Sequence, residues 1–301
     1  MIKLAYIQTN VFTDEHFEFS GNQLATFYDE QANKELTTEQ MLALAREINF
    51  SETTFVLEPT TKDCSWKVRI FTPGGELPFA GHPTLGTSFV LRHKQKISQN
   101  DPKTTLELNI GPINVTFDKQ NIVMTQPKPE FQEEFTKRDV IASILGLSAD
   151  NIETDYPMQT VTTGVPFLMV PLKKLADVQN ITLDSNKLAG IMKSNGFLGL
   201  YVFAPETVYQ ENQLHARMLT SVEELIEDPA TGSAAGPAIA YLEKYNVLKN
   251  HTRGELIHIE QGYEMNRPSR LVGQILEENT ELSGVKVMGK VKLTLEGIYY
   301  V

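Results

Sequence analysis

The hydrophobic residues of this chain recur in many short runs, some alternating with polar positions and some continuously apolar. β-Branched and aromatic residues are frequent in these runs, and turn residues such as Pro73-Gly74-Gly75 and Gly111-Pro112 separate them. Alternation with period two between turn residues is typical of β-strands. The strands predicted in this way span residues 2–8, 53–57, 66–71, 105–110, 113–117, 122–124, 161–170, 198–204, 214–219, 256–260, 271–275, 285–288 and 291–295.

Helices are predicted in fewer places. Residues 38–49 carry apolar side chains at helical spacing, and Thr37 with Gln40 forms a capping-box pattern. Residues 84–95 and 234–245 are apolar nearly all round, and a helix of that kind belongs inside a fold. Two shorter surface helices are predicted at 140–145 and 188–194. The predicted fold class is therefore α+β, with strands dominating.

The order of these features repeats between the two halves of the chain. Arg69 follows Gly21 by 48 positions, and Arg217 follows Gly164 by 53. Each half has, in this order, a glycine after a strand, a helix, a strand with an arginine, an acidic turn, and a glycine that opens an apolar helix. In the first half these features are Gly21, 38–49, Arg69, Glu76 and Gly81. In the second half they are Gly164, 188–194, Arg217, 223–228 and Gly232. The repeat predicts two like domains that meet across a cleft, with the helix starts at Gly81 and Gly232 facing one another.

The two glycine-led helix starts have a chemistry of their own. A helix N-terminus has unpaired N–H groups and about half a positive charge, and glycine lets a ligand approach the backbone closely. A carboxylate or other small anion fits such a place without any Lys or Arg. Alternatively, Gly81 and Gly232 only permit tight turns, but their paired setting favours binding.

Three titratable side chains stand near these features. His82 directly follows Gly81, and Asp228 lies five positions before Ser233. Glu47 lies on the flank of the helix predicted at 38–49. Each has an ordinary alternative role, namely a satisfied hydrogen bond for the histidine, a cap or turn for the aspartate and a solvent-facing position for the glutamate.

Composition and charge exclude several classes of function. The chain has 301 residues, a formal charge of −11 and an isoelectric point near 5.1. Since no cluster of basic residues of the kind that follows phosphates occurs, nucleic acid is not an expected partner. No run approaches ~20 consecutive apolar residues, so no membrane span is expected. The first residues lack the pattern of a signal peptide, and we expect a cytoplasmic protein.

Metal and cofactor chemistry have no support in the sequence. Cys64 is the single cysteine, which excludes an internal disulfide and a thiolate metal cage. The histidines form no His-x-x-x-His or His-x-His pair. No Gly-x-Gly-x-x-Gly after a strand, no P-loop and no Gly-x-Ser-x-Gly elbow occurs, so we expect no metal and no cofactor.

Several longer segments resemble the phenazine-biosynthesis PhzF-like family, from about residue 5 to the C-terminus. The segments that carry the resemblance are residues 45–53 (AREINFSET), 69–73 (RIFTP), 76–86 (ELPFAGHPTLG), 228–236 (DPATGSAAG), 261–262 (QG) and 267–269 (RPS). The resemblance implies the diaminopimelate-epimerase-like fold, in which two similar domains each wrap a curved, mostly antiparallel β-sheet around a central helix. On this fold we expect an N-terminal domain at 1–126, with a C-terminal strand at about 287–301 returning to it, and a C-terminal domain at 127–286.

The resemblance also implies an activity and a set of site residues. The best-understood activity of the family is isomerisation of trans-2,3-dihydro-3-hydroxyanthranilate by moving a proton between ring carbons. Family members need neither metal nor organic cofactor, and they are commonly homodimers. In this chain Glu47 would be the acid/base, with a pKa raised by burial. His82, Asp228 and Ser233 would assist protonation and positioning. The backbone N–H groups of Gly81 and Gly232, with Thr231, would hold the substrate carboxylate.

Two alternatives stay open at this stage. The chain could bind a small carboxylate without turning it over, although Glu47, His82, Asp228 and Ser233 argue against this. It could also be an amino-acid racemase or epimerase on the same fold, but that chemistry uses two facing thiols and Cys64 is alone. The expected ligand is a small carboxylate about the size of one six-membered ring.

Overall fold

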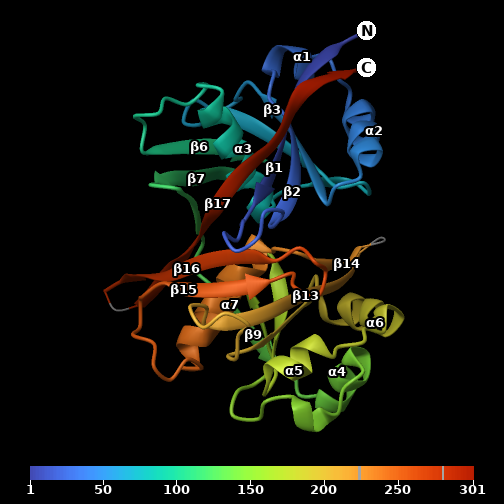
Figure 1. Ribbon diagram of the computed structural model, residues 1–301, viewed down its shortest axis with the longest axis vertical. Coiled ribbons are helices and arrows are strands. Elements are labelled where there is room, and N and C mark those ends of the chain that lie inside the picture. Colours follow the sequence, from blue (N-terminus) through green and yellow to red (C-terminus); the bar gives the residue numbers. More distant parts are fainter. Residues whose placement is uncertain (223–224, 280) are drawn as a thin grey trace. The chain divides into compact units, whose positions relative to one another are not determined.

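The computed structural model describes residues 1–222, 225–279 and 281–301. These residues form two compact units, one of Met1–Thr125 with Met288–Val301 and one of Gln126–Val287 (Figure 1). The acidic turn predicted at 223–228 lies partly outside the described residues, because Glu223 and Glu224 are not among them. None of the helices in the described part of the chain is long and apolar enough to cross a membrane.

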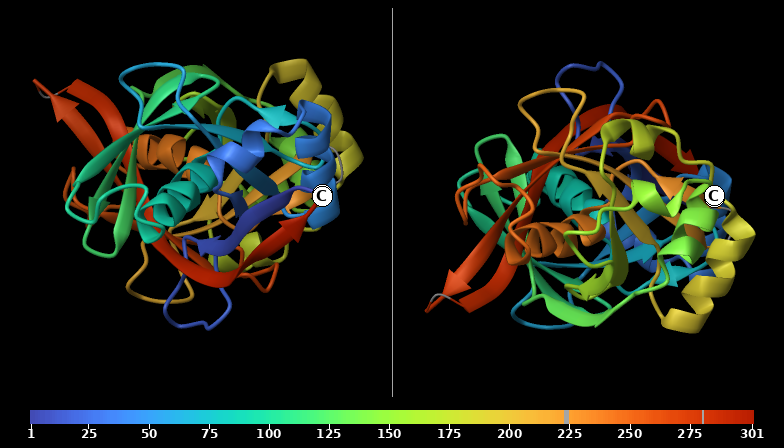
Figure 2. Two further views of the ribbon diagram at one scale, coloured as in Figure 1. Left: turned by 90° about the horizontal axis from the view of Figure 1, so that it is seen from above. Right: turned by 90° about the horizontal axis from the view of Figure 1, so that it is seen from below.

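The first unit is a curved sheet that holds one helix on its inner side. In chain order its elements are β1 (Lys3–Val11), β2 (Asn22–Phe27), α1 (Glu30–Lys34), α2 (Thr38–Ile48), β3 (Glu52–Leu57), β4 (Trp66–Phe71), β5 (Glu76–Leu77), α3 (Gly81–His93), β6 (Lys103–Leu108), β7 (Gly111–Asp118) and β8 (Asn121–Gln126). The last part of β17 (Glu281–Tyr300) pairs with β1. The helix α3 contacts β1, β2 and β3, and ten of its thirteen residues are buried (Figure 2).

The second unit has the same plan. Its elements are β9 (Glu130–Glu134), α4 (Arg138–Leu145), a 3₁₀ turn (Ala149–Asn151), β10 (Gln159–Thr162), β11 (Pro166–Pro171), α5 (Leu175–Gln179), α6 (Ser185–Asn195), β12 (Leu200–Ala204), β13 (Leu214–Val222), β14 (Leu225–Asp228), α7 (Gly232–Lys244), β15 (Ile257–Gln261), β16 (Ser269–Glu278) and the first part of β17. The helix α7 contacts β10, β11 and β16, and ten of its thirteen residues are buried.

Strand pairing repeats in the same order within the two units. In the first, β1–β2 is antiparallel, β2–β3 parallel, β3–β4 and β4–β5 antiparallel, β4–β6 parallel and β6–β7 antiparallel. In the second, β10 to β16 follow the same series of antiparallel and parallel pairs. Each parallel pair needs a crossover, which helices supply. The repeated topology agrees with the duplication predicted from the sequence.

The helices predicted as apolar on every side are the central helices α3 and α7, although each begins two or three residues earlier than predicted. The predicted capping box is present: the Thr37 hydroxyl accepts from the Gln40 N–H, and the Gln40 side chain accepts from the Thr37 N–H. The single strand predicted at 161–170 is wrong. A turn at Gly164, with φ +125°, separates β10 from β11, and their antiparallel pairing makes this segment a hairpin.

Candidate functional site

An arginine–glutamate pair braces the hairpin before each central helix. Arg69 of β4 binds Glu76 of β5 through Nε–Oε1 (2.8 Å) and Nη2–Oε2 (2.6 Å). Arg217 of β13 binds Glu227 of β14 in the same two-pronged way, at 2.9 and 2.7 Å. Two parallel bonds between a planar guanidinium and a carboxylate fix orientation as well as distance. The predicted repeat of an arginine and an acidic turn therefore has a structural basis, a braced hairpin that leads to each helix start.

Both central helices begin without a side-chain cap. Among the described residues, no side chain bonds the first N–H groups of α3 or α7 from the cap positions Ala80 and Thr231, and neither first turn contains an acidic residue. Gly81 and Gly232 are the first residues of these helices. Neither helix therefore supplies a cap side chain or an acidic residue of its own first turn to offset the partial positive charge of its start.

His82 lies in a polar network within the first unit. Its Nδ1 is 3.2 Å from Asn22 Nδ2, and its Nε2 is 3.2 Å from Oε2 of Glu52. Asn22 Oδ1 accepts from the Ser51 hydroxyl at 3.0 Å. Since the amide nitrogen of Asn22 can only donate, His82 Nδ1 accepts and the neutral ring carries its proton on Nε2. This network brings together residues of β2, β3 and the first turn of α3.

Glu52 is the strongly perturbed carboxyl of this network. Its side chain is 15% exposed. Burial raises the pKa of Glu52 to about 7, against the opposing effect of a hydrogen bond from Ser51. A carboxyl that titrates near neutral pH is suited to take up and return a proton, and such groups concentrate at functional sites.

Glu47 does not have the buried position that we expected for the acid/base. It lies on α2 with its side chain exposed. The pKa of Tyr299 on β17 is raised, first by burial of the tyrosine and then by the negative charge of Glu47. Glu47 therefore lies near that tyrosine. The prediction of a buried Glu47 is therefore wrong, because Glu47 faces outward in the last turn of α2, which ends at Ile48, and Glu52 follows on the next strand.

Asp228 and Thr231 precede the start of α7 in the second unit, and both are buried. The Thr231 hydroxyl donates to Oδ2 of Asp228. The side-chain amide of Gln261, at the end of β15, donates to the Asp228 carbonyl at 2.7 Å and to Thr231 Oγ1 at 3.1 Å. Ser233 follows in the first turn of α7 and is half-buried. The structure thus groups Asp228 and Thr231 with Gln261, which the sequence did not single out as a site residue.

Strand register is the signal in the sequence that bears on Glu52, because it fixes which residues of β3 share its face. Side chains two apart on a strand share a face, so Glu52 lies on the same side of β3 as Thr54. Thr54 accepts a hydrogen bond from Thr87 of α3 at 2.9 Å. The face of β3 that carries Glu52 is therefore the one that packs against the helix opening at Gly81. No comparable periodic signal marks Gln261 or Asn22.

A metal centre has no ligand set in the described residues, since no group of three or more His, Cys, Asp or Glu side chains there is arranged to hold an ion. Cys64 is a buried thiol in the first unit.

Solved structures of other proteins share this fold. A *Bacillus anthracis* phenazine biosynthesis protein of the PhzF family superposes with a TM-score of 0.89 at 24% identity over all of both chains. A probable proline racemase from *Agrobacterium radiobacter* superposes with a TM-score of 0.61 at 10% identity, over 99% of this chain and 92% of the other. Those two likenesses show the fold, a mixed α+β architecture.

Sequence comparison gives the family. Residues 9–297 match the PhzC-PhzF family, described as phenazine biosynthesis-like protein. An uncharacterized isomerase of Mesorhizobium japonicum is 32% identical, over 98% of each chain. The trans-2,3-dihydro-3-hydroxyanthranilate isomerase of Pseudomonas aeruginosa is 31% identical, over 98% of this chain and 99% of that protein. The chain belongs to the PhzC-PhzF family and is an isomerase of that family.

Proposed function

We propose that the protein moves a proton between carbons of a small cyclic carboxylate similar to trans-2,3-dihydro-3-hydroxyanthranilate, without metal or organic cofactor. The relatives named for that reaction, at 31% and 32% identity, support the substrate class. The observation that carries the proposal is the buried carboxyl of Glu52 beside His82, with a pKa near 7.

Glu52 takes the acid/base role that we first expected of Glu47. As a carboxylate it accepts a proton from one ring carbon, and as a carboxylic acid it returns that proton to another carbon, so no net proton is gained or lost. A pKa near the working pH makes both forms available. The His82 ring, whose Nε2 lies 3.2 Å from Oε2 of Glu52, would help to position the carboxylate. A positioned group of this type contributes about 10²–10⁴-fold to the rate.

The remaining predicted site residues keep their proposed roles. The N–H groups at the start of α3, at Gly81, and at the start of α7, at Gly232, are each suited to a carboxylate, because neither cap residue bonds them through its side chain and a helix start carries partial positive charge. Asp228, Thr231 and Ser233 would contact polar groups of the substrate. The predictions of a homodimer and of a cytoplasmic location stay predictions.

The test measures proton exchange at carbon. Purified protein is incubated in D₂O with trans-2,3-dihydro-3-hydroxyanthranilate and a set of cyclic β-amino acids, and deuterium entry into the carbon skeleton is followed by NMR. We expect Glu52→Gln to lower the rate of exchange by at least about 100-fold. Glu47→Gln is the matched control, the same change of charge five residues away on an exposed face, and should stay within about twofold of wild type.

Two outcomes would contradict the proposal. If Glu47→Gln abolishes exchange and Glu52→Gln does not, the acid/base assignment is wrong. If no ligand that binds shows exchange with the wild-type protein, the chain is a carboxylate-binding protein on this fold. The two-thiol epimerase alternative has no support, since Cys64 is the single cysteine of the sequence.

A further inference from the structure

The buried amide of Gln261 makes contacts that leave its orientation in no doubt. The residue is fully buried at the end of β15. Its Nε2 is 2.7 Å from the Asp228 carbonyl, which can only accept. Its Oε1 is 3.4 Å from the backbone N–H of Thr231, which can only donate. Two backbone groups of opposite kind therefore fix which end of the side chain is nitrogen and which is oxygen.

The direction of the next hydrogen bond follows from that orientation. Nε2 of Gln261 also lies 3.1 Å from Thr231 Oγ1, and an amide nitrogen has only donors to offer. The Thr231 oxygen accepts there, so its own hydrogen points elsewhere, and the neighbouring acceptor is Oδ2 of Asp228. The Tyr201 hydroxyl donates to Gln261 Oε1 at 3.3 Å, so it is the first donor in this series of hydrogen bonds.

We propose that Gln261 and Thr231 are positioning residues that hold Oδ2 of Asp228 permanently as a hydrogen-bond acceptor, so that any proton carried by Asp228 sits on Oδ1. These bonds form a hydrogen-bond chain in which every group donates to the next, from the Tyr201 hydroxyl to the Gln261 amide, then to the Thr231 hydroxyl and the Asp228 carboxylate. Its direction is a property of the protein alone. Its consequence for catalysis, that Asp228 gains or gives up a proton only at Oδ1, rests on the proposed function.

Two features around these residues keep the hydrogen-bond chain in this direction. Burial, and then the charge of Asp228, raises the pKa of Tyr201, so its hydroxyl stays a donor at neutral pH. Gly262, directly after Gln261, has φ +81°, and a Cβ there would lie 2.6 Å from the Pro229 carbonyl and 2.5 Å from the Arg267 carbonyl. The end of β15 therefore lies close to the segment between Asp228 and Thr231.

The test reads Asp228 directly in the ligand-free protein. The pH midpoint of its carboxyl ¹³C signal, assigned with Asp228→Asn, is compared among wild type, Thr231→Val and Thr231→Ser. The valine variant removes a donor to the charged carboxylate, so the midpoint should move up by about one pH unit. The serine variant keeps the hydroxyl and should stay close to wild type. Thr220→Val is the matched control, since the Thr220 hydroxyl donates to the Leu198 carbonyl and to no carboxylate.

Neutron diffraction on deuterated crystals provides a second measurement that needs no variant to fold. It should show the Thr231 deuteron directed at Asp228 and two deuterons on the Gln261 nitrogen. A Thr231 deuteron directed at Gln261, or an unchanged Asp228 midpoint in a folded Thr231→Val protein, would overturn the proposal. If these readouts agree but no substrate exchanges deuterium, the proposed function has failed while the hydrogen-bond chain stands.

Where activity is present, Thr231→Val should also shift the pH profile of kcat in the direction of the Asp228 midpoint, with Thr231→Ser restoring it. A purely structural role for Thr231 would lower the rate at every pH and leave the profile in place.

Discussion

Glu52 should make the first unit less stable as the pH rises, and Glu52→Gln should remove that dependence. The folded protein raises the pKa of Glu52 from 4.5 to about 7, chiefly through burial. Below pH 4.5 the carboxyl is protonated in both the folded and the unfolded chain, so it does not make the free energy of unfolding depend on pH. Between 4.5 and 7 the unfolded chain releases the proton first, so the folded state binds more protons and the free energy of unfolding falls with pH.

The size of the effect follows from the same two values. At 1.36 kcal/mol for each pH unit, the difference between 4.5 and 7 corresponds to about 3 kcal/mol, fully developed only above pH 7. The neutral amide of Glu52→Gln has no such penalty. We therefore expect the variant to gain up to about 3 kcal/mol over wild type between pH 4.5 and pH 8.5, while it loses activity. Higher stability together with lower activity in Glu52→Gln is expected if the charged carboxylate of Glu52 both serves the reaction and destabilises the fold.

Urea unfolding at the two pH values, followed by tryptophan fluorescence, measures this. Trp66 is the single tryptophan and lies on β4 of the first unit, so its signal reports the unit that contains Glu52. Glu47→Gln, on the exposed face of α2, controls for the loss of one negative charge. If the stability difference between Glu52→Gln and wild type is the same at pH 4.5 and pH 8.5, Glu52 titrates as an ordinary glutamate and the reasoning is refuted.

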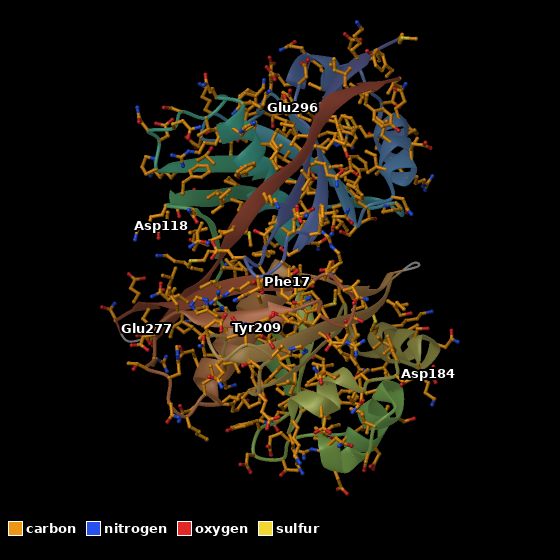
Figure 3. All side chains as sticks on the ribbon, viewed as in Figure 1. Phe17, Asp118, Asp184, Tyr209, Glu277 and Glu296 are labelled. Carbon is orange, nitrogen blue, oxygen red and sulfur yellow. The ribbon has the colours of Figure 1, made fainter. Side chains whose placement is uncertain are left out.

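Three further predictions concern the framework of the site. Glu227→Gln leaves the guanidinium of Arg217 buried with its charge unpaired and should cost about 3–5 kcal/mol of unfolding free energy, more than Glu76→Gln in the less buried Arg69–Glu76 pair; equal losses in urea unfolding would count against burial as the cause. Gly262→Ala should lower the melting temperature more than Gly164→Ala, because both have positive φ but only at Gly262 would the Cβ meet backbone oxygens; calorimetry of the two variants decides this. His215 is buried between Glu260 and Glu264, with Nδ1–Oε1 at 2.7 Å and Nε2–Oε1 at 2.9 Å. Glu260 also accepts from the backbone N–H of Tyr209, a residue that Figure 3 labels. Burial alone would lower the pKa of His215, but the bonds to Glu260 and Glu264 outweigh it and raise the value above 6.5, so this stabilisation is present below pH 6.5 and is lost as the pH rises through the raised pKa. An NMR titration of the His215 ring that gives a midpoint at or below 6.5 would contradict this.

The periodic parts of the fold were predictable from the sequence. The capping box at Thr37 and Gln40 depends on residues three apart and is present as predicted. Apolar residues on every side placed α3 and α7 inside their units, since such a helix has no face for water. The repeat of Arg69 and Arg217 anticipated the two braced hairpins, because a strand, a turn and a charged pair are all local in sequence.

Local patterns failed where a contact joins distant segments. Residues 161–170 look like one apolar strand, and only the pairing of β10 with β11 shows the turn at Gly164. Glu47 and Glu52 stand in the same motif, and period and motif alone do not tell which one is buried. That difference depends on α2 facing outward and on β3 meeting the helix that carries His82, thirty residues further along the chain.

The sequence by itself determined the family, the α+β class and the two central helices, because these depend on motif and on hydrophobic period. Tertiary structure decided which polar groups lose contact with water and which partners they gain. The raised pKa of Glu52 and the fixed orientation of Gln261 arise from packing between elements distant in sequence, and burial is a property of that packing rather than of any single residue.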